Sequence, residues 1–158
     1  MTHSGAAILF GLALAVGGCG GKNVEIDPES ATVGTRWNAT LATPAQLAGA
    51  VQVKGTGWMS GEKDDTTKTR AYVSIQNAVP GGEHPWHVHL GQCGNDRGIF
   101  GAAGAYSPLR VGSDGQAQES AVLQVPEPVA GQYFINVHAS RNNMGTIVAC
   151  GNLAPPSR

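Results

Sequence analysis

The chain has 158 residues, which is enough for one ordinary domain with a single core and some tail. Charged residues make up 13% of it and the formal net charge is -1, so it lacks the basic field that neutralises nucleic-acid phosphates. These values argue against a nucleic-acid-binding protein. Glycine is abundant, at 23 residues, and beyond the N-terminal segment no long stretch repeats apolar residues at a helical period, which predicts an all-β domain rich in turns.

The N-terminus carries an apolar stretch, AAILFGLALAV (6–16), that is too short to span a bilayer and has the length of a signal-peptide core. It runs into VGGC (16–19), which resembles the bacterial lipobox, where signal peptidase cuts before a lipid-modified cysteine. The resemblance implies a signal peptide over 1–18 and a lipid on Cys19. With Gly20 rather than aspartate next, it implies the outer membrane of the cell envelope, on the periplasmic side. An ordinary secretory signal with a chance cysteine is the alternative.

The rest of the chain divides into a tether and a domain. Residues 19–47 are mixed and polar without a sustained period, as in a flexible tether, so we expect the domain over 48–153 and a tail over 154–158. Asp114-Gly115 predicts a hairpin between two strand-like runs within 108–125. The strand-like runs of the domain lie at 50–59, 70–78, 84–90, 108–125, 132–139 and 146–150. Seven or eight strands with frequent turns predict a β-sandwich or closed barrel.

Lipidation of Cys19 would leave two thiols, Cys93 and Cys150, in an exported and oxidising compartment. We expect these two cysteines to form a disulfide. In the chain-entropy model, closing a loop of this size stabilises the domain by roughly 4 kcal/mol. Two free buried thiols are the alternative.

Three of the five histidines lie in the segment HPWHVH (84–89). If this segment is a strand, His87 and His89 project from one face and both rings can reach a single ion. His84 has the opposite parity and is expected to support them, while His138, at the end of YFINVH, is the candidate for a third ligand from a neighbouring strand. Three imidazoles favour copper or zinc over calcium or magnesium. Histidines with purely structural partners on a strand are the alternative.

HPWHVH, the cysteine soon after it, the YxxxVH strand and the terminal IVACGNL together resemble the Cu/Zn superoxide dismutase superfamily. The resemblance spans about Ala50 to Leu153 but is concentrated in three short blocks. It implies a Greek-key β-sandwich that binds one copper per chain. The residues it identifies are the copper ligands His87, His89 and His138, the structural histidine His84, and the disulfide cysteines Cys93 and Cys150.

The chain also departs from this superfamily. No histidine lies between HPWHVH and the YxxxVH strand, so the histidine that bridges copper and zinc and the remaining zinc histidines have no counterpart. Asp96 alone cannot hold zinc. The active-site arginine of the family is expected three residues before the second cysteine, where this chain has Ile147, and Arg141 and Arg97 are nearby candidates for guiding an anion. The sequence therefore predicts a copper site without zinc.

The resemblance implies superoxide dismutation at a three-histidine copper site, with superoxide as the substrate and the membrane as a partner through the lipid on Cys19. Three other functions stay open. The first is a copper buffering or delivery module, in which Met144 adds a soft ligand. The second is an interaction domain with a vestigial site, and the third is a hydrolytic or hydratase zinc centre. The sequence leaves the oligomeric state open.

Overall fold

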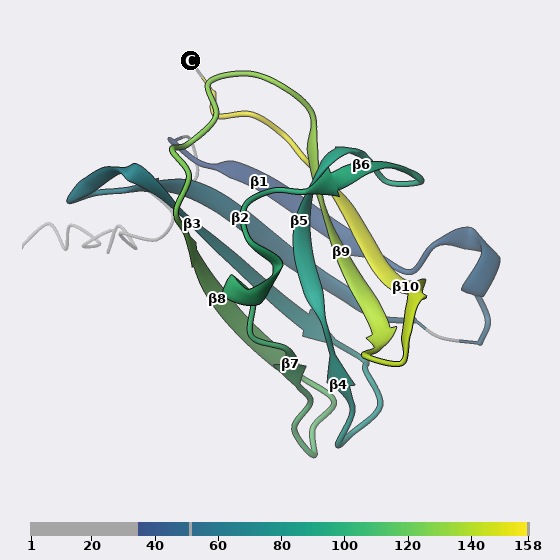
Figure 1. The fold of residues 1–158 in the computed structure, drawn as a ribbon. Helices are drawn as coiled ribbons and strands as arrows, with labels where there is room; N and C mark the ends of the chain where they lie inside the picture. The colour runs from purple at the N-terminus through teal and green to yellow at the C-terminus, as the bar shows by residue number, and fades with distance from the viewer. Residues whose placement is uncertain (1–34, 51, 158) are drawn as a thin grey trace, which may run out of the picture.

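The computed structural model describes residues 35–50 and 52–157, so the expected signal peptide and Cys19 lie outside the described residues. Within these ranges the chain forms ten strands and two short 3-10 helices (Figure 1). Neither helix in the described part is long and apolar enough to cross a membrane. The elements are β1 (Trp37–Ala42), η2 (Ala45–Leu47), β2 (Lys54–Glu62), β3 (Asp65–Gln76), β4 (Glu83–His84), β5 (Trp86–Gln92), β6 (Asn95–Ile99), η3 (Ala103–Ala105), β7 (Leu109–Arg110), β8 (Ala117–Leu123), β9 (Tyr133–Ser140) and β10 (Asn143–Leu153).

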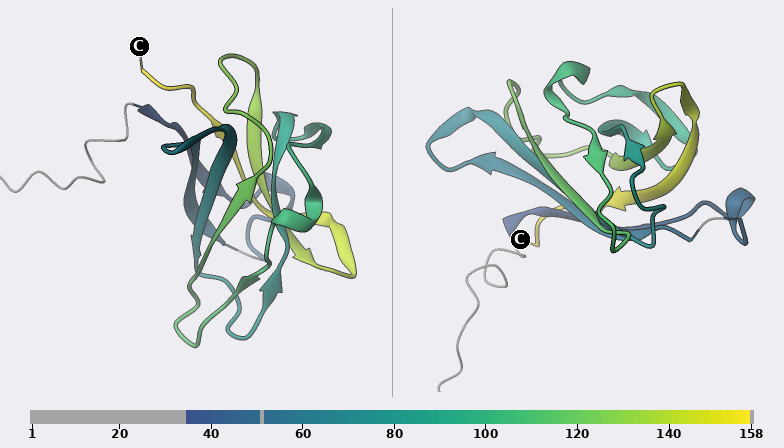
Figure 2. Two further views of the ribbon diagram at one scale, coloured as in Figure 1. Left: turned by 60° about the vertical axis from the view of Figure 1, so that its left-hand side comes forward. Right: turned by 90° about the horizontal axis from the view of Figure 1, so that it is seen from below.

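Eight strands form one antiparallel sheet in the order β6-β5-β9-β10-β1-β2-β3-β8, and β4 pairs with β7 in a small second sheet. The consecutive strands β1, β2 and β3 lie beside β10 from the end of the chain, which is a Greek-key order. The large sheet curls, so that β2 faces β9 across the interior (Figure 2). Gly57 on β2 has no room for a side chain because Ile135 of β9 fills the space. The predicted all-β sandwich or barrel is confirmed.

Alternation of apolar and polar residues places one face of each strand in the core. On β3, Ala71, Val73 and Ile75 are buried while the residues between them are partly exposed, as a period of two requires. The other large buried side chains of the core come from both sides of the curl: Trp37, Leu41, Met59, Trp86, Val88, Leu109, Leu123, Ile135 and Val137. This continuous core fixes the strands whose outer faces carry the histidines.

The predicted tether over 19–47 is wrong in its last part, because β1 lies within it. Trp37 and Leu41 are each 1% exposed, and their strand pairs with both β2 and β10. The polar residues Asn38 and Thr40 alternate with them and face outward, which gives the segment its mixed composition. The folded domain therefore begins before residue 48, and β1 lies between β10 and β2 in the middle of the large sheet.

The predicted hairpin within 108–125 is wrong in its pairing, although its turn is present. The Gly112 amide donates to the carbonyl oxygen of Gln116 across the turn that contains Asp114-Gly115, at 2.8 Å. The strands on either side then diverge, because β7 pairs with β4 and β8 pairs with β3. The turn chemistry thus predicted the chain reversal but could not predict the partners of the strands.

Candidate metal centre

Strands β5, β9 and β10 lie side by side, and their register brings the predicted site residues together. His87 on β5 lies opposite Asn136 on β9, which in turn lies opposite Cys150 on β10. His138 is two residues beyond Asn136 and therefore shares its face of β9. Ile147 of β10 is paired with His138. The core-facing side chains of β5 and β9 point the other way, so the histidines occupy the opposite face of the sheet from the core.

The three predicted ligands form one cluster. His87, His89 and His138 each offer a ring nitrogen, and these atoms lie within 4.8 Å of one another. Nδ1 of His87 is 3.3 Å from Nε2 of His138. All three side chains are buried, at 7%, 3% and 5% exposure. The prediction that these three histidines gather into a group that could hold a metal ion is confirmed.

Hydrogen bonds fix which nitrogen of two rings faces the cluster. Nδ1 of His138 donates to the main-chain carbonyl oxygen of Met144 at 2.6 Å, and Nδ1 of His89 donates to Oδ1 of Asp96 at 3.0 Å. Because carbonyl and carboxylate oxygens only accept, both rings carry a proton on Nδ1, and a neutral ring in this orientation offers its lone pair on Nε2. Nε2 of His89 is buried and has no hydrogen-bond partner among the described residues. An ion would satisfy this orphaned nitrogen.

Asp96 reaches His89 because the chain reverses sharply between β5 and β6. Gly91 has a φ of 108°, and a side chain there would collide with the carbonyl oxygen of Asn95. The returning strand holds the Asp96 carboxylate with a further hydrogen bond, which the Gly98 amide donates at 2.7 Å. A carboxylate that orients the far nitrogen of a ligating histidine is a recurrent partner in metal sites.

His84 supports the cluster without joining it. It lies on β4, is 9% exposed, and its Nδ1 donates to the main-chain carbonyl oxygen of His138 at 3.0 Å. The ring thus ties β4 to the end of β9 that carries the third ligand. This contact is with the backbone of His138 rather than with the His87 or His89 ring.

The surroundings keep two of the imidazoles neutral. Burial, helped by the neighbouring His138 and His89 rings, lowers the pKa of His87 to about 4, against the opposing effect of Asp96. Burial also lowers the pKa of His138, although its hydrogen bond to the Met144 carbonyl acts in the opposite direction. A metal ion binds imidazole only in the neutral form, so at neutral pH these ligands need lose no proton first.

The same shift predicts how the metal-free protein responds to acid. The pKa of His87 is about 4 in the folded chain against 6.5 as its ordinary value, so the unfolded chain binds more protons between these limits. We expect the free energy of unfolding to fall by an amount on the order of 2 kcal/mol as the pH drops through this window. Urea unfolding from pH 7 to pH 4 measures it. The fall should be smaller in His87→Gln, and an identical profile in both proteins would contradict the assignment.

Of the two predicted arginines, Arg141 pairs with a carboxylate and Arg97 is exposed. Nε of Arg141 donates to Oε1 of Glu83 at 2.9 Å, in the turn between β9 and β10. Arg97 lies on β6 and is exposed. Their role in guiding an anion stays a prediction. Met144 contacts His138 through its main-chain carbonyl oxygen, and its side chain is 38% exposed.

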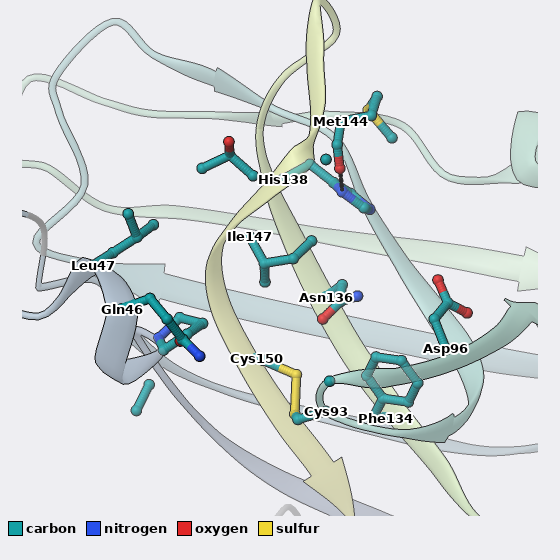
Figure 3. A pocket seen from close by; sticks show the side chains of 15 residues that line it. Gln46, Leu47, Cys93, Asp96, Phe134, Asn136, His138, Met144, Ile147 and Cys150 are labelled. Atoms are coloured by element: carbon teal, nitrogen blue, oxygen red, sulfur yellow. Dashed lines mark hydrogen bonds between the residues drawn. A yellow bond between two sulfur atoms is a disulfide. The ribbon is translucent and has the colours of Figure 1, made fainter.

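A groove of about 710 Å³ opens beside the cluster (Figure 3). It runs from His138 and Asp96, past Asn136, to the disulfide and to η2. Leu47 and Ile147 contribute apolar side chains to its walls. The groove gives a molecule from solvent a route to the surroundings of His138.

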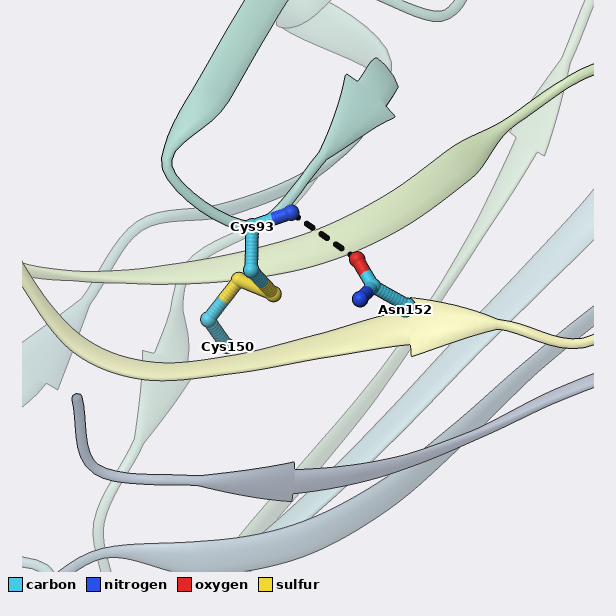
Figure 4. The surroundings of a disulfide bond; sticks show 3 residues. All are labelled: Cys93, Cys150 and Asn152. Carbon is cyan, nitrogen blue, oxygen red and sulfur yellow. Dashed lines mark hydrogen bonds between the residues drawn. A yellow bond between two sulfur atoms is a disulfide. The ribbon is translucent and has the colours of Figure 1, made fainter.

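The predicted disulfide joins Cys93 and Cys150, whose Cα atoms are 6.0 Å apart (Figure 4). The Cys93 amide also donates to Oδ1 of Asn152 at 2.8 Å. These two links fasten the β5–β6 turn to β10. Because the same turn leads into Asp96, the disulfide also fixes the segment that orients His89.

Removing the disulfide is expected to lower the free energy of unfolding by about 4 kcal/mol, because the sulfurs close a loop with a sequence separation of 57 residues. Urea unfolding of the oxidised chain and of a Cys93→Ala, Cys150→Ala double variant measures the difference. A loss below about 1 kcal/mol would show that the disulfide contributes little to the stability of the fold.

Comparison with protein-family models and with curated proteins finds no match for this chain.

Sequence reasoning missed two parts of the site. Asp96 was considered only as a zinc ligand, whereas it orients His89. Met144 was considered for its sulfur, whereas its carbonyl oxygen orients His138. For Asp96 a signal existed, since a carboxylate seven residues after a strand histidine can return beside it in a hairpin.

Proposed function

We propose that the chain is a copper protein of the Cu/Zn superoxide dismutase type, with a single three-histidine copper site, no zinc, and superoxide as its substrate. The observation that carries this proposal is the orphaned Nε2 of His89, which is buried beside ring nitrogens of His87 and His138. A buried nitrogen without a partner is costly unless something binds it. We further propose that a lipid on Cys19 attaches the protein to the bacterial envelope.

The donor set supports copper in this proposal. Three imidazole ligands match the preference of copper, and zinc shares part of that preference. Among the described residues no second group of histidine, cysteine, aspartate or glutamate side chains stands beside the first. Bound copper would supply the one-electron cycle between Cu(II) and Cu(I) that converts two superoxide ions and two protons into dioxygen and hydrogen peroxide.

The chain's own residues would hold the site in one geometry through both halves of that cycle. Asp96 and the Met144 carbonyl lock the His89 and His138 rings by their Nδ1 protons. His87 is held between neighbouring rings, with the Tyr106 ring centroid 5.1 Å from its own. The groove reaches His138, and water in the groove would have to deliver the protons that no bridging histidine provides here.

Superoxide consumption by the copper-loaded full chain tests the proposal, with His87→Ala loaded in the same way as the comparison. The expected result is consumption that depends on copper and is lost in the variant. If the chain binds one copper but consumes no superoxide in a copper-dependent way, dismutation is contradicted.

That contradicting result would favour a copper buffering or delivery module, and one observation supports this second function. Among the described residues that line the groove, Asp96 is the charged side chain and there is no lysine or arginine. A negative charge beside the entrance repels an anionic substrate. A buffer that exchanges copper needs no such attraction.

The carboxylate of Asp96 should matter for copper affinity in either case. Asp96→Ala removes the acceptor that orients His89, and we expect copper affinity to fall by about 10- to 100-fold. Asp96→Asn keeps an acceptor and should lose less. Competition with a chromogenic copper chelator measures both variants, and equal affinity of Asp96→Ala and the unchanged chain would show that Asp96 does not position the ring.

A further inference from the structure

His87 differs from the other two histidines of the cluster in what orients its ring. Hydrogen bonds from Nδ1 to oxygen atoms of the chain hold the other two rings. The His87 ring has one hydrogen-bond contact among the described residues, between its Nδ1 and Nε2 of His138 at 3.3 Å. A ring nitrogen whose lone pair binds a metal ion cannot also accept a hydrogen bond. An ion bound by both nitrogens would therefore end this contact, and packing would have to hold the His87 ring.

Tyr106 supplies such packing. Its ring meets the His87 ring nearly at right angles, at 79°, with the two centroids 5.1 Å apart. Tyr106 is 8% exposed and is part of the hydrophobic core, where close packing leaves a ring little room to move aside. An edge-to-face contact between two rings depends on their relative angle, so turning the His87 ring would break it.

The Tyr106 ring is itself held in place. Its hydroxyl donates to the main-chain carbonyl oxygen of Phe100 at 2.6 Å, and its ring meets Trp86 edge-on with centroids 5.1 Å apart. The indole N–H of Trp86 donates to the carbonyl oxygen of Ser107, the next residue along the chain, at 2.8 Å. These contacts anchor the segment between β6 and β7 against the start of β5, so the Tyr106 ring is a fixed wall for His87.

We infer that Tyr106 is the positioning residue of His87 and keeps Nδ1 of that ring turned toward the cluster. A half-turn of the imidazole about its bond to Cβ would exchange Nδ1 for a carbon atom, and the site would lose a ligand. Tyr106 acts through packing and not as a ligand, because its hydroxyl is bonded to Phe100. The inference rests on the proposed copper site, but it does not depend on superoxide as the substrate.

The first test uses the metal-free full chain with the disulfide formed, so its result does not depend on copper. Nuclear Overhauser contacts of the His87 ring protons show by NMR which edge of the ring faces the cluster. We expect one orientation in the unaltered chain and in Tyr106→Phe, which keeps the ring, and two orientations in Tyr106→Leu. A single, unchanged orientation in Tyr106→Leu would overturn the inference.

Tyr133→Leu is the matched control. The Tyr133 ring packs edge-on against Trp37 and Phe100, and its ring contacts among the described residues include no histidine. This variant loses a similar aromatic side chain but should keep the single orientation of His87. A second orientation in Tyr133→Leu as well would show that any loosening of the core turns the ring, which would overturn the specific role of Tyr106.

The second test measures Cu(I) affinity by competition with a chelator. Tyr106→Leu should bind copper about tenfold more weakly, the low end of the loss expected when a ligand loses the group that orients it. Affinity should change little in Tyr106→Phe and Tyr133→Leu. Equal affinity of Tyr106→Leu and the unaltered chain would overturn the inference. If the unaltered chain binds no copper, the proposed copper site is contradicted instead, and the metal-free test alone decides whether Tyr106 positions His87.

Discussion

Replacing His89 with alanine is expected to weaken copper binding more than 100-fold, the largest effect of any substitution at the site. The change removes a ring nitrogen of the cluster that is buried and has no hydrogen-bond partner among the described residues, and it leaves two ligands that cannot enclose an ion. Loss of a supporting partner alone costs about 10- to 100-fold, so loss of a ligand should cost more. Competition with a copper chelator measures the affinity.

His84→Ala is the matched control for this prediction. It also removes a buried histidine, but one whose ring contacts the backbone of His138. Copper affinity should fall far less in His84→Ala than in His89→Ala, with both variants checked for folding by circular dichroism. Equal losses would mean that the effect arises from general disturbance of the fold and not from the loss of a ligand.

Trp86→Ala is expected to destabilise the domain by about 3–5 kcal/mol, the largest stability loss of any single core substitution. Trp86 is fully buried at the start of β5, its indole N–H donates to the carbonyl oxygen of Ser107 at 2.8 Å, and its ring meets Tyr106 edge-on at 5.1 Å. The substitution therefore leaves a large cavity and an unpaired carbonyl group. Urea unfolding of the metal-free chain measures the loss.

Trp58→Ala provides the comparison, because this tryptophan lies on the outer face of β2 and is only partly buried. Its ring stacks on Tyr72, with centroids 5.5 Å apart. We expect a loss of no more than about 1.5 kcal/mol, in line with one aromatic pair. A loss as large as that of Trp86→Ala would show that the outer face, and not the core under the histidines, dominates the stability.

The parts of the fold that could be predicted are those that depend on short-range patterns. The alternation of Ala71, Val73 and Ile75 identified a strand because neighbouring side chains point to opposite faces. The same rule placed His87 and His89 on one face of β5. For these segments, the order of neighbouring residues is enough to decide which face of the strand each side chain occupies.

The errors arose where distant partners decide the structure. The segment of β1 is half polar, so only its pairing with β2 and β10 shows that Trp37 and Leu41 enter the core. The two-residue strands β4 and β7 are too short to carry a periodic signal, and they exist because they pair with each other. The amino-acid composition of a short segment does not show which distant strand it will pair with.

The residues of the candidate site also fall into those that could be predicted and those that could not. The ligand residues could be predicted because histidine is rare and its spacing is informative. The partners that orient them could not, since Asp96 reaches His89 only through the reversal at Gly91, and Met144 uses an atom that every residue has. The contact that Tyr106 makes with the cluster is likewise visible only once the segment between β6 and β7 has folded.

Electron paramagnetic resonance of the chain loaded with Cu(II) tests the central proposal most directly, since nitrogen couplings count the imidazoles at the metal. The three-histidine site predicts one copper per chain with three coupled imidazoles, and a changed spectrum with one fewer in His138→Ala. A spectrum that is the same in both proteins, or copper that binds without coupling to imidazole nitrogen, would contradict the assignment of His87, His89 and His138 as the metal centre.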